Sequence, residues 1–592
     1  MTRTSDERPD RSYSQPRQGD IKVSTRHHHR RPTGRSRPRA AAVALAALVI
    51  VAAACGGDDD TADTPATAAG TDTPAGTTGD TDQPASSDPV TTSGGDNGGE
   101  GRVRGGNLTM VTTSQLLSHD PQLQRVSFAF TEGPQMSAIF GHLAYMDPTT
   151  GEVTLYFLES LEANDDFTTW TMKLHDGILF SDDTPLDAEA IAYNIRRAAD
   201  PETGSRFQPD AEGLELEVLD ALTLAVTLPA TDANWDASLV SYFAGIGSPT
   251  AMEAAKAAGE EFGANPVGAG PFKIKEWIPG QTMIVERNPN FETFRPGQPY
   301  LDQITFENLP DQSQQVSAMT TGTAQLASPN GAGSVQAMLD ADGVDAIVTY
   351  TSGGSNVLLN NTRPPFDDPR ARRAVQLALD PVGAADAFAS GTPPVTAMFS
   401  PDSPFYDDAY TFPLPDHEEA QRLFDELAAE GKPVEFAYTT QDSAAQAVMS
   451  NYLVGQFAQF DNVSIEIDTR TGADYITASR AGEYQMLPNG LYYSNPIPTL
   501  IDGVAPTGVL NSFGWDNAAV GEALERLKTI PPDDIAAQKE VWDIVQEEFL
   551  KDLPFYWVGQ GVVAFSFTDD VLVTKTLNFG NYPLWPEVGL AE

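Results

Sequence analysis

The sequence predicts an α/β protein with more than one lobe, and three observations support this prediction. The chain has 592 residues, whereas a single domain usually has roughly 100 to 150. A strand, a tight turn and a capped helix follow one another between Trp170 and Arg197. From Gly105 onward, segments with the periodicity of strands and of helices alternate through most of the chain. This order is typical of lobes in which helices cover a sheet.

The segment from Trp170 to Arg197 gives the clearest of these patterns. Its first residues alternate between apolar and polar, which is the period of a strand with one buried face. The pair Asp176-Gly177 then predicts a turn. Asp187 is placed to N-cap the next helix, because the apolar residues that follow it recur on one helical face.

The same segment resembles the signature of the family 5 extracytoplasmic solute-binding proteins, the peptide- and nickel-type receptors of ABC importers. That signature runs approximately W-T-F-x-L-R-x-G-V-x-F-S-D-G-T-P-L-T-A-x-D-V. The matching residues are Trp170, Thr171, Leu174, Gly177, Phe180, Ser181, Asp182, Thr184, Pro185, Leu186 and Ala188. Asp183 stands where the signature has glycine. Glu189-Ala190 replaces the x-Asp of the signature, so we expect the turn and the cap to differ slightly.

Two further segments resemble the family in the same order along the chain. Residues 265–291 are similar to P-V-G-T-G-P-Y-K-L followed by a strand and E-R-N-P-x-Y, and residues 357–380 match a third passage. Gly268 and Gly270 predict a tight turn before a strand. A phosphate cradle is the alternative, but a strand follows where such a site needs a helix N-terminus.

Two helices of the second half are predicted from their ends. Asp368 can N-cap a helix with Pro369 at its first position. Asp416 and Glu419 have the spacing of a capping box, and Gly431 is placed to stop that helix. Three arginines of the first helix suggest either anion binding or, as we expect, a solvated or salt-bridged face: Arg370, Arg372 and Arg373.

The resemblance covers about residues 105 to 585 and implies a fold and a division into domains. The fold is a two-lobed periplasmic-binding-protein-like α/β fold with a hinge and a central ligand cleft, plus a small extra domain. The implied domains are lobe I at 105–145, 230–354 and 556–592, the extra domain at 146–229, and lobe II at 355–555.

The N-terminal region predicts a lipoprotein signal peptide over residues 1–54. An apolar run from Ala40 to Ala54 follows a basic stretch and is shorter than the ~20 residues that span a membrane. The chain's single cysteine, Cys55, follows this run in a segment that resembles a bacterial lipobox. We therefore expect lipidation at Cys55, which would anchor the protein on the extracytoplasmic face of the cell membrane. Residues 55–104 are poor in large apolar side chains and predict a disordered tether.

The composition excludes several classes of partner. Asp and Glu number 83 against 36 Lys and Arg, for a formal net charge of −47. A surface this acidic repels nucleic acid and anionic lipid headgroups. We therefore expect no nucleic-acid partner, and we expect contact with the membrane only through the lipid anchor. A single cysteine also excludes an intramolecular disulfide. We expect the protein to be a monomer.

Catalytic and metal-binding patterns are missing from the sequence. It has no nucleophile elbow, no Cys/His cluster with metal spacing and no Walker loop. Beyond the leader there are four widely separated histidines: His119, His142, His175 and His417. We therefore expect no enzymatic activity, no metal and no cofactor. The many carboxylates leave a glycosidase with an acid/base pair as an alternative.

Candidate ligand-binding residues lie just before Pro496. Peptide-binding members of the family carry a motif like G-W-x-x-D-x-x-x-P, whose Asp pairs with the peptide α-amine. Aligned on Pro496, Tyr492 stands at the Asp position and Asn489 at the Trp position. We expect Tyr492, Tyr493 and Asn489 to bind ligand, with the tyrosines stacking on a sugar or aromatic group and hydrogen-bonding to it. The alternative is that both tyrosines are core or rim residues.

The expected function is capture of a solute outside the membrane and its delivery to an ABC permease. Oligopeptide is the default ligand class of the family. Without the carboxylate, however, a buried ammonium group would lack its partner. An oligosaccharide or another uncharged solute is therefore the alternative ligand, and the scarcity of histidines argues against nickel.

Overall fold

The computed structural model describes residues 101–113, 118–123, 132–205, 207–329, 331–389, 392–578 and 580–592. The predicted signal peptide, Cys55 and all but the last residues of the predicted tether lie outside this part of the chain, so those predictions stay untested. Within the described residues, no helix is both long enough and apolar enough to cross a membrane.

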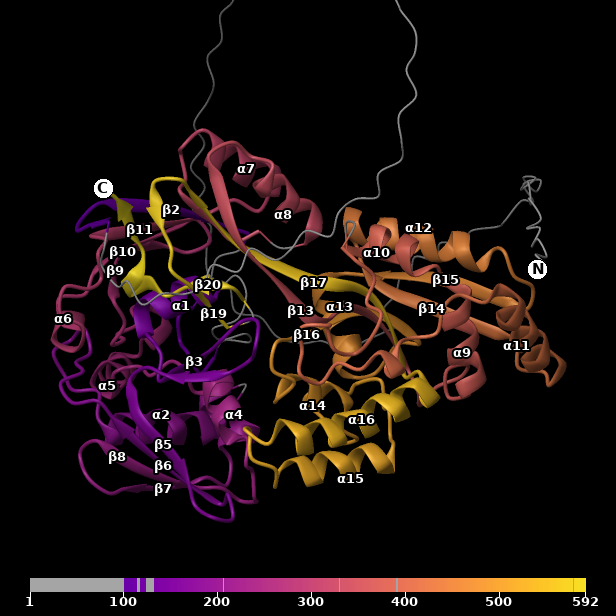
Figure 1. Ribbon diagram of the computed structural model, residues 1–592, viewed down its shortest axis with the longest axis horizontal. Coiled ribbons are helices and arrows are strands. Elements are labelled where there is room, and N and C mark those ends of the chain that lie inside the picture. Colours follow the sequence, from indigo (N-terminus) through magenta and orange to yellow (C-terminus); the bar gives the residue numbers. More distant parts are fainter. Residues whose placement is uncertain are drawn as a thin grey trace, which may run out of the picture. The chain divides into compact units, whose positions relative to one another are not determined.

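A ten-stranded mixed sheet runs through the folded part of the chain (Figure 1). Its two longest strands, β13 and β17, lie side by side at its middle and pair antiparallel. Strand β13 pairs with β17 on one edge and with β16 on the other, and β17 pairs with β13 and with β12. In spatial order the strands are β15 (Val463–Arg470), β14 (Val434–Gln441), β16 (Met486–Tyr493), β13 (Val344–Leu359), β17 (Phe555–Thr568), β12 (Leu326–Ala327), β2 (Asn107–Thr112), β11 (Gln303–Asn308), β10 (Thr282–Arg287) and β9 (Phe272–Ile278).

Helices cover both faces of the sheet around β14, β15 and β16, and we call this three-layered part lobe II. Alternate residues of β13 face opposite layers, so Val357 packs in one core and Leu358 in the other. The Val357 layer contains α9 (Pro369–Ala378), α10 (Pro381–Ala389), α11 (His417–Ala429) and α12 (Ala444–Phe457). The Leu358 side carries α13 (Gly472–Arg480), α14 (Thr499–Val504), α15 (Ala518–Leu527) and α16 (Ile535–Asp552).

The other end of the large sheet, with β2 and β9 to β12, belongs to the part that we call lobe I. Gly268 and Gly270 lie here in close contact with helix α1, since a Cβ added to Gly268 would lie 2.2 Å from the Ile139 carbonyl oxygen. The turn predicted at these glycines is therefore needed for close packing. The helices of this part are α1 (Gly133–Phe140), α4 (Trp235–Tyr242), α5 (Pro249–Ala258), α6 (Phe291–Phe294), α7 (Gln312–Thr320) and α8 (Ala332–Leu339).

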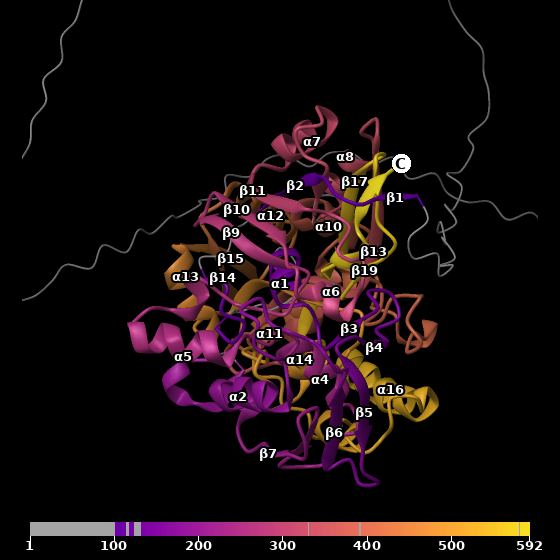
Figure 2. The same ribbon diagram turned by 90° about the vertical axis from the view of Figure 1, so that its left-hand side faces the viewer.

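A separate four-stranded antiparallel sheet contains the segment with the clearest sequence pattern. Figures 1 and 2 show helix α2 beside this sheet. Asp187 caps α2 as predicted, because its carboxylate accepts a hydrogen bond from the Ala190 amide at 2.9 Å. Asp183 adopts a left-handed conformation with φ of 70°, which explains the glycine of the signature. The elements are β5 (Leu158–Ala163), β6 (Thr169–Leu174), β8 (Thr223–Thr227), β7 (Glu215–Val218), α2 (Ala188–Ala199) and α3 (Gln208–Ala211).

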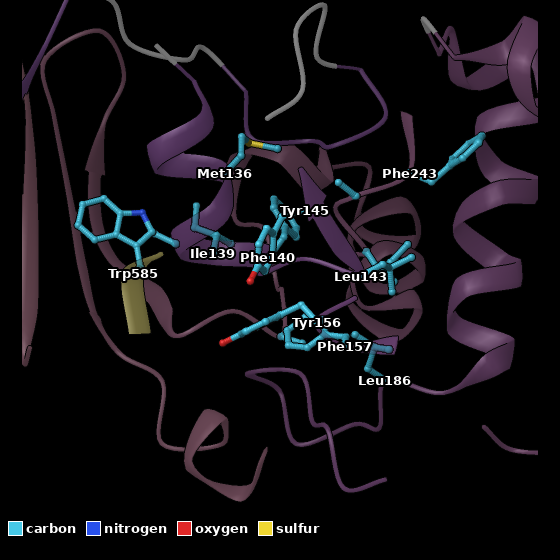
Figure 3. Packing of buried hydrophobic residues seen from close by; sticks show 14 of the residues in the cluster. Met136, Ile139, Phe140, Leu143, Tyr145, Tyr156, Phe157, Leu186, Phe243 and Trp585 are labelled. Carbon is cyan, nitrogen blue, oxygen red and sulfur yellow. The ribbon is translucent and has the colours of Figure 1, made fainter. Parts of the chain in front are cut away.

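This small sheet shares one hydrophobic core with lobe I. Figure 3 shows the part of this core around helix α1. Trp170 of the small sheet and Phe306 of the large sheet belong to the same buried cluster. The C-terminal segment joins it through Trp585, whose indole N–H donates to the Pro134 carbonyl oxygen at 2.7 Å. Short strands complete this region: β1 (Arg102–Val103), β21 (Gly589–Ala591), β18 (Val571–Leu572), β19 (Thr576–Leu577), β20 (Tyr582–Pro583), β3 (Ala144–Met146) and β4 (Val153–Leu155).

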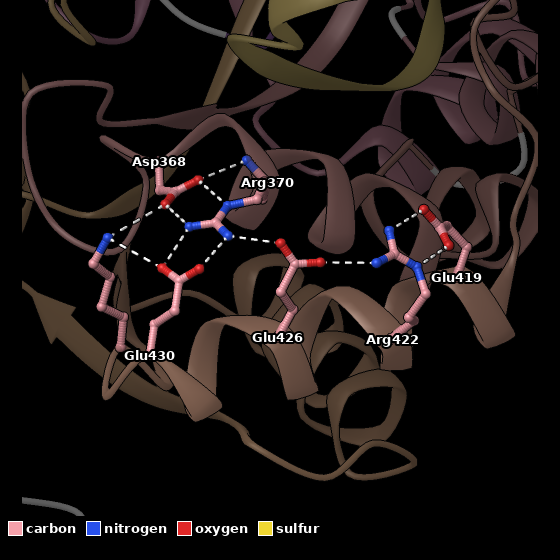
Figure 4. A network of polar contacts seen from close by, with 7 residues as sticks. Asp368, Arg370, Glu419, Arg422, Glu426 and Glu430 are labelled. Atoms are coloured by element: carbon pink, nitrogen blue, oxygen red, sulfur yellow. Dashed lines mark hydrogen bonds and ion pairs between the residues drawn. The ribbon is translucent and has the colours of Figure 1, made fainter.

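Two local predictions for lobe II need correction. Asp416 caps α11 by accepting from the Glu419 amide at 3.0 Å. The Glu419 carboxylate does not complete the capping box, because it pairs with Arg422 of the next turn, as Figure 4 shows. Arg372 is buried rather than solvated, and it donates to the carbonyl oxygens of Phe366 and Asp552. The other two arginines fit the prediction: Arg370 forms salt bridges, with carboxylates of α11 among its partners, and Arg373 is exposed.

Candidate functional site

A group of glycines lies where strands β13, β16 and β17 run side by side. The pairing of β13 with β17 shifts register on both sides of Gly354. A Cβ on Gly354 would lie 2.1 Å from the Gly559 carbonyl oxygen, and one on Gly353 would lie 2.2 Å from the Leu491 carbonyl oxygen. Gly353 and Gly354 also have positive φ values of 68° and 152°. Only glycine fits here, and the bulge lies where the pairing of β13 with β16 begins.

Tyr492 lies over this point. It pairs with Gly353 in the sheet, and its hydroxyl lies 2.8 Å from the Ser355 hydroxyl oxygen. Its ring fills the space above two more glycines, since a Cβ on Gly490 or on Gly561 would lie within about 2.5 Å of ring atoms. Burial raises the pKa of the Tyr492 phenol. The side chain is therefore a neutral hydrogen-bonding group at neutral pH.

Tyr493 points to the opposite face of β16, because successive side chains of a strand alternate. It is 1% exposed, and its hydroxyl donates to the Met398 carbonyl oxygen at 2.5 Å. Its ring packs edge-on against Phe399. The structure thus places Tyr493 in the core of lobe II, where it supports β16 from behind.

Asn489 lies on the same face as Tyr493, nearer the start of the strand. It is exposed, and its side-chain amide donates to the Asn356 side-chain oxygen at 3.2 Å. The structure therefore does not bring the three predicted site residues together on one face: Tyr492 faces one way, and Asn489 and Tyr493 the other.

One edge of β16 carries no neighbouring strand over most of its length. Strand β14 pairs with β16 only at Tyr438 and Met486, and beyond that point β13 is its one partner among the described strands. The Pro488 carbonyl oxygen points to this open edge, where the Tyr475 hydroxyl donates to it at 2.5 Å. Because backbone groups alternate between edges, the N–H and C=O groups of Gly490 and Tyr492 point the same way. An extended ligand backbone can pair with such an edge.

The lobes also meet away from the long strands, at the start of helix α4. The Ala233 amide donates to the Lys528 carbonyl oxygen at 2.7 Å. The buried Asn234 side chain donates to the Leu527 carbonyl oxygen at 3.1 Å and accepts from Gln538 at 3.1 Å. These bonds join α4 to the helices α15 and α16 of lobe II. The two lobes are therefore in direct contact at α4 as well as through the long strands.

The histidines do not form a metal site in the described part of the chain, where no group of three or more His, Cys, Asp or Glu residues is placed to hold an ion. His119 and His142 are both buried. Burial lowers the pKa of His119 to about 4 and that of His142 to about 3. Both rings are therefore neutral at physiological pH.

Two groups of residues at the site were not singled out in the sequence. Ser355 binds the Tyr492 hydroxyl, and Gly561 makes room for the ring. Their signal is present in the runs Ser352-Gly353-Gly354-Ser355 and Gly559-Gln560-Gly561, because paired glycines inside a strand mark a bulge or a close backbone approach. The pairing of these two distant runs is visible only in the fold.

Comparison with known proteins places the chain among binding proteins. The family model described as bacterial extracellular solute-binding proteins, family 5 middle, matches residues 152–500. The glutathione-binding protein GsiB of Shigella flexneri serotype 5b is 30% identical over 329 residues. That match covers 55% of this chain and 61% of the relative, so the chain matches about three-fifths of the length of this relative.

Solved structures are similar in fold across most of the chain. The oligopeptide-binding protein AppA from Bacillus subtilis, in complex with a nonapeptide, has a TM-score of 0.68 and 17% identity, and covers 83% of this chain and 100% of its own. AgaA from A. tumefaciens R10, in complex with agropinic acid, has a TM-score of 0.69 and 19% identity, and covers 82% and 99%. At these identities the likeness establishes the two-lobed α/β fold.

Proposed function

Because the chain belongs to the bacterial extracellular solute-binding proteins of family 5, we propose that it captures a solute outside the cytoplasm and presents it to the permease of an ABC importer. The observation that carries this proposal is the open edge of β16 beside Tyr492, at the junction of two lobes in contact. A ligand held there would touch both lobes and bias them toward one arrangement. The permease would then distinguish the liganded arrangement from the free one.

The ligand class that this edge favours is an oligopeptide. Backbone N–H and C=O groups at a strand edge bind the backbone of an added strand and tolerate varied side chains. In support, AppA is described in complex with a nonapeptide and GsiB as a glutathione-binding protein. Tyr492 offers a neutral hydroxyl and a ring face where peptide-binding relatives have a carboxylate, so a free α-amine would not be held by this residue.

A second ligand class, an oligosaccharide or another uncharged solute, is favoured by the same residue. The neutral phenol of Tyr492 and the hydroxyl of Ser355 match the hydroxyls of a sugar, and a tyrosine ring can stack on a sugar face. The structure of AgaA contains agropinic acid as its ligand, so the ligands of proteins with this fold are not restricted to peptides.

A thermal-shift screen of the purified protein against peptide, sugar and amine libraries tests these alternatives. A ligand that binds the folded state raises the melting temperature with its concentration. For a peptide hit, we expect N-methylation at alternate backbone positions to abolish the shift, because the methyl groups remove the donors that pair with β16. A hit from the sugar library with no peptide hit would overturn the peptide assignment. Hydrolysis of a sugar with turnover would instead favour the glycosidase alternative.

For the N-terminal region, we propose lipid anchoring through Cys55, with residues 55–104 as the tether between anchor and folded part. The support is the lipobox-like sequence, the basic and apolar leader and the family's extracellular location. The folded part itself would act as a monomer, held near its permease by the tether.

A further inference from the structure

A cavity of about 400 Å³ lies in lobe II beside the open edge of β16. Its walls come from β13, β16, the start of β17, α13, α14 and the segment between α14 and α15. Four of its lining residues are buried apolar side chains that form a deep apolar surface: Leu358, Leu491, Phe513 and Phe555. Three residues of β16 line the cavity: Asn489, Gly490 and Leu491. A ligand on the open edge of β16 would therefore lie next to the cavity.

Among the polar residues that line the cavity, Asn356 has a buried side-chain group without a partner in the described part of the chain. Asn356 is 0% exposed, and its side-chain oxygen accepts the hydrogen bond from Asn489 at 3.2 Å. Its side-chain N–H₂ finds no acceptor among the described residues. Buried amides are almost always satisfied in native proteins. An unused amide donor in the wall of a cavity therefore indicates a place for a ligand oxygen.

The mouth of the cavity has a different character. Arg480, at the last turn of α13, is exposed and forms no ion pair within the described part of the chain. Val509 and Leu510 also line the cavity and are 70% and 42% exposed. At the deep wall an anion would lose its water and gain only neutral donors such as the Asn356 amide. At the mouth it can keep part of its water and pair with the Arg480 guanidinium.

On the basis of the proposed function as a peptide receptor, we propose that this cavity is a side-chain subsite that selects tyrosine-like residues. The aromatic body would pack on the apolar wall, and the phenol oxygen would accept from Asn356. Arg480 would favour a negative group next to that residue, such as a terminal carboxylate. Phenylalanine would fill the same space but leave the Asn356 amide unsatisfied, so the subsite discriminates between the two side chains.

Isothermal titration calorimetry with defined peptides tests this subsite. The probes are hexaalanine and two sets of hexapeptides in which tyrosine or phenylalanine replaces each alanine in turn. For the native protein, we expect tyrosine to bind about five- to tenfold tighter than phenylalanine at one position, the effect of one neutral hydrogen bond in a buried site. Asn356→Leu should remove this preference while keeping the affinity for the phenylalanine peptide.

Two more variants keep the test decisive. Ser479→Trp, at the mouth of the cavity, should lower the affinity of the tyrosine peptide to that of hexaalanine, even if Asn356→Leu does not fold. Arg480→Gln should weaken peptides with a free carboxylate more than their amides. Val448→Ser, on exposed α12, is the control and should change neither ratio.

The outcomes separate this inference from the function on which it rests. Binding of hexaalanine with equal affinities for tyrosine and phenylalanine at every position would overturn the subsite and leave the peptide receptor standing. Absence of binding by every peptide would overturn the peptide receptor itself.

Discussion

The hydroxyl groups of Tyr492 and Ser355 lie 2.8 Å apart, across the pairing of β16 with β13. This bond fixes the tyrosine ring over Gly490 and Gly561, beside the bulge at which the pairing of β13 with β16 begins. A ligand that touches the ring would therefore contact both β16 and the long strands that join the lobes.

Replacing Tyr492 tests its place in the site. We expect Tyr492→Ala to weaken binding of the strongest hit from the ligand screen by about 1 to 3 kcal/mol, the scale of a lost aromatic contact and hydrogen bond. Tyr492→Phe should lose only the part due to the hydroxyl. Titration calorimetry measures both, with melting temperature as the check on folding. An unchanged dissociation constant in a stably folded Tyr492→Ala protein would remove this residue from the site.

Gly561→Ala probes the same ring without changing it. The added Cβ would lie 2.2 Å from the Thr351 hydroxyl oxygen and 2.5 Å from a Tyr492 ring carbon. Tyr492 must then move, so we expect a loss of about 1 to 3 kcal/mol in stability from overpacking and weaker ligand binding. Gly455→Ala is the control, because no atom lies within 4 Å of its added Cβ and α12 should gain stability. An unchanged ligand affinity in Gly561→Ala would show that the position of the Tyr492 ring does not affect binding.

Much of the fold could be predicted from local patterns. The alternation after Trp170, the cap at Asp187 and the stop at Gly431 each depend on residues close in the chain, and the structure confirms all three. Glu419 shows the limit of such reasoning. Its spacing fits a capping box, but Arg422 competes for the carboxylate and offers a charged partner.

The site was harder to predict because it depends on pairing between distant segments. The sequence places Tyr492 and Tyr493 side by side, yet only strand alternation in the fold decides which one faces Ser355 and which one faces Met398. The orphaned amide of Asn356 could not be predicted, since burial and the absence of a partner both arise from packing across β13 and β16.

The salt bridges of Arg370 predict a pH dependence of stability (Figure 4). Its guanidinium pairs with Asp368, Glu426 and Glu430 at 2.7 to 2.8 Å. Hydrogen bonding to Arg370 lowers the pKa of Glu430 to about 2 and also lowers the pKa values of Asp368 and Glu426. A carboxylate with a depressed pKa in the folded state stabilises it above the ordinary pKa, and this contribution disappears as the pH falls through the folded value.

We therefore expect Arg370→Gln to melt at a lower temperature than the native protein at pH 7. The difference should shrink as the pH falls from about 4.5 toward about 2, where the carboxylates take up protons. Melting curves across this range measure it. Arg196→Gln, which breaks one exposed pair with Glu189, is the control and should have little effect at any pH. A constant difference between pH 7 and pH 3 would contradict the assignment to these carboxylates.

Lipid anchoring predicts a simple result for Cys55→Ser. This variant should lose labelling by a radioactive fatty acid and leave the membrane fraction, because no acyl chain can be attached. Ligand affinity should stay the same, since the predicted tether separates the anchor from the folded part. Retained labelling of the variant would show that the lipobox assignment is wrong.

The contact at α4 predicts how the lobes move. Asn234→Ala removes the hydrogen bonds from its side chain to the Leu527 carbonyl and from Gln538 to its side-chain oxygen. Each such bond is worth about 0.5 to 1.5 kcal/mol, so the population of separated lobes should rise. Small-angle scattering of the free variant should give a larger radius of gyration than that of the native protein, and saturating ligand should restore the native value.

Because part of the binding energy must then bring the lobes together, we expect the dissociation constant to rise about tenfold. Asn308→Ala is the control, since this asparagine donates to the Gly280 carbonyl within lobe I and should change neither radius nor affinity. Identical radii for native and Asn234→Ala proteins, with and without ligand, would contradict a movement of the lobes at this contact.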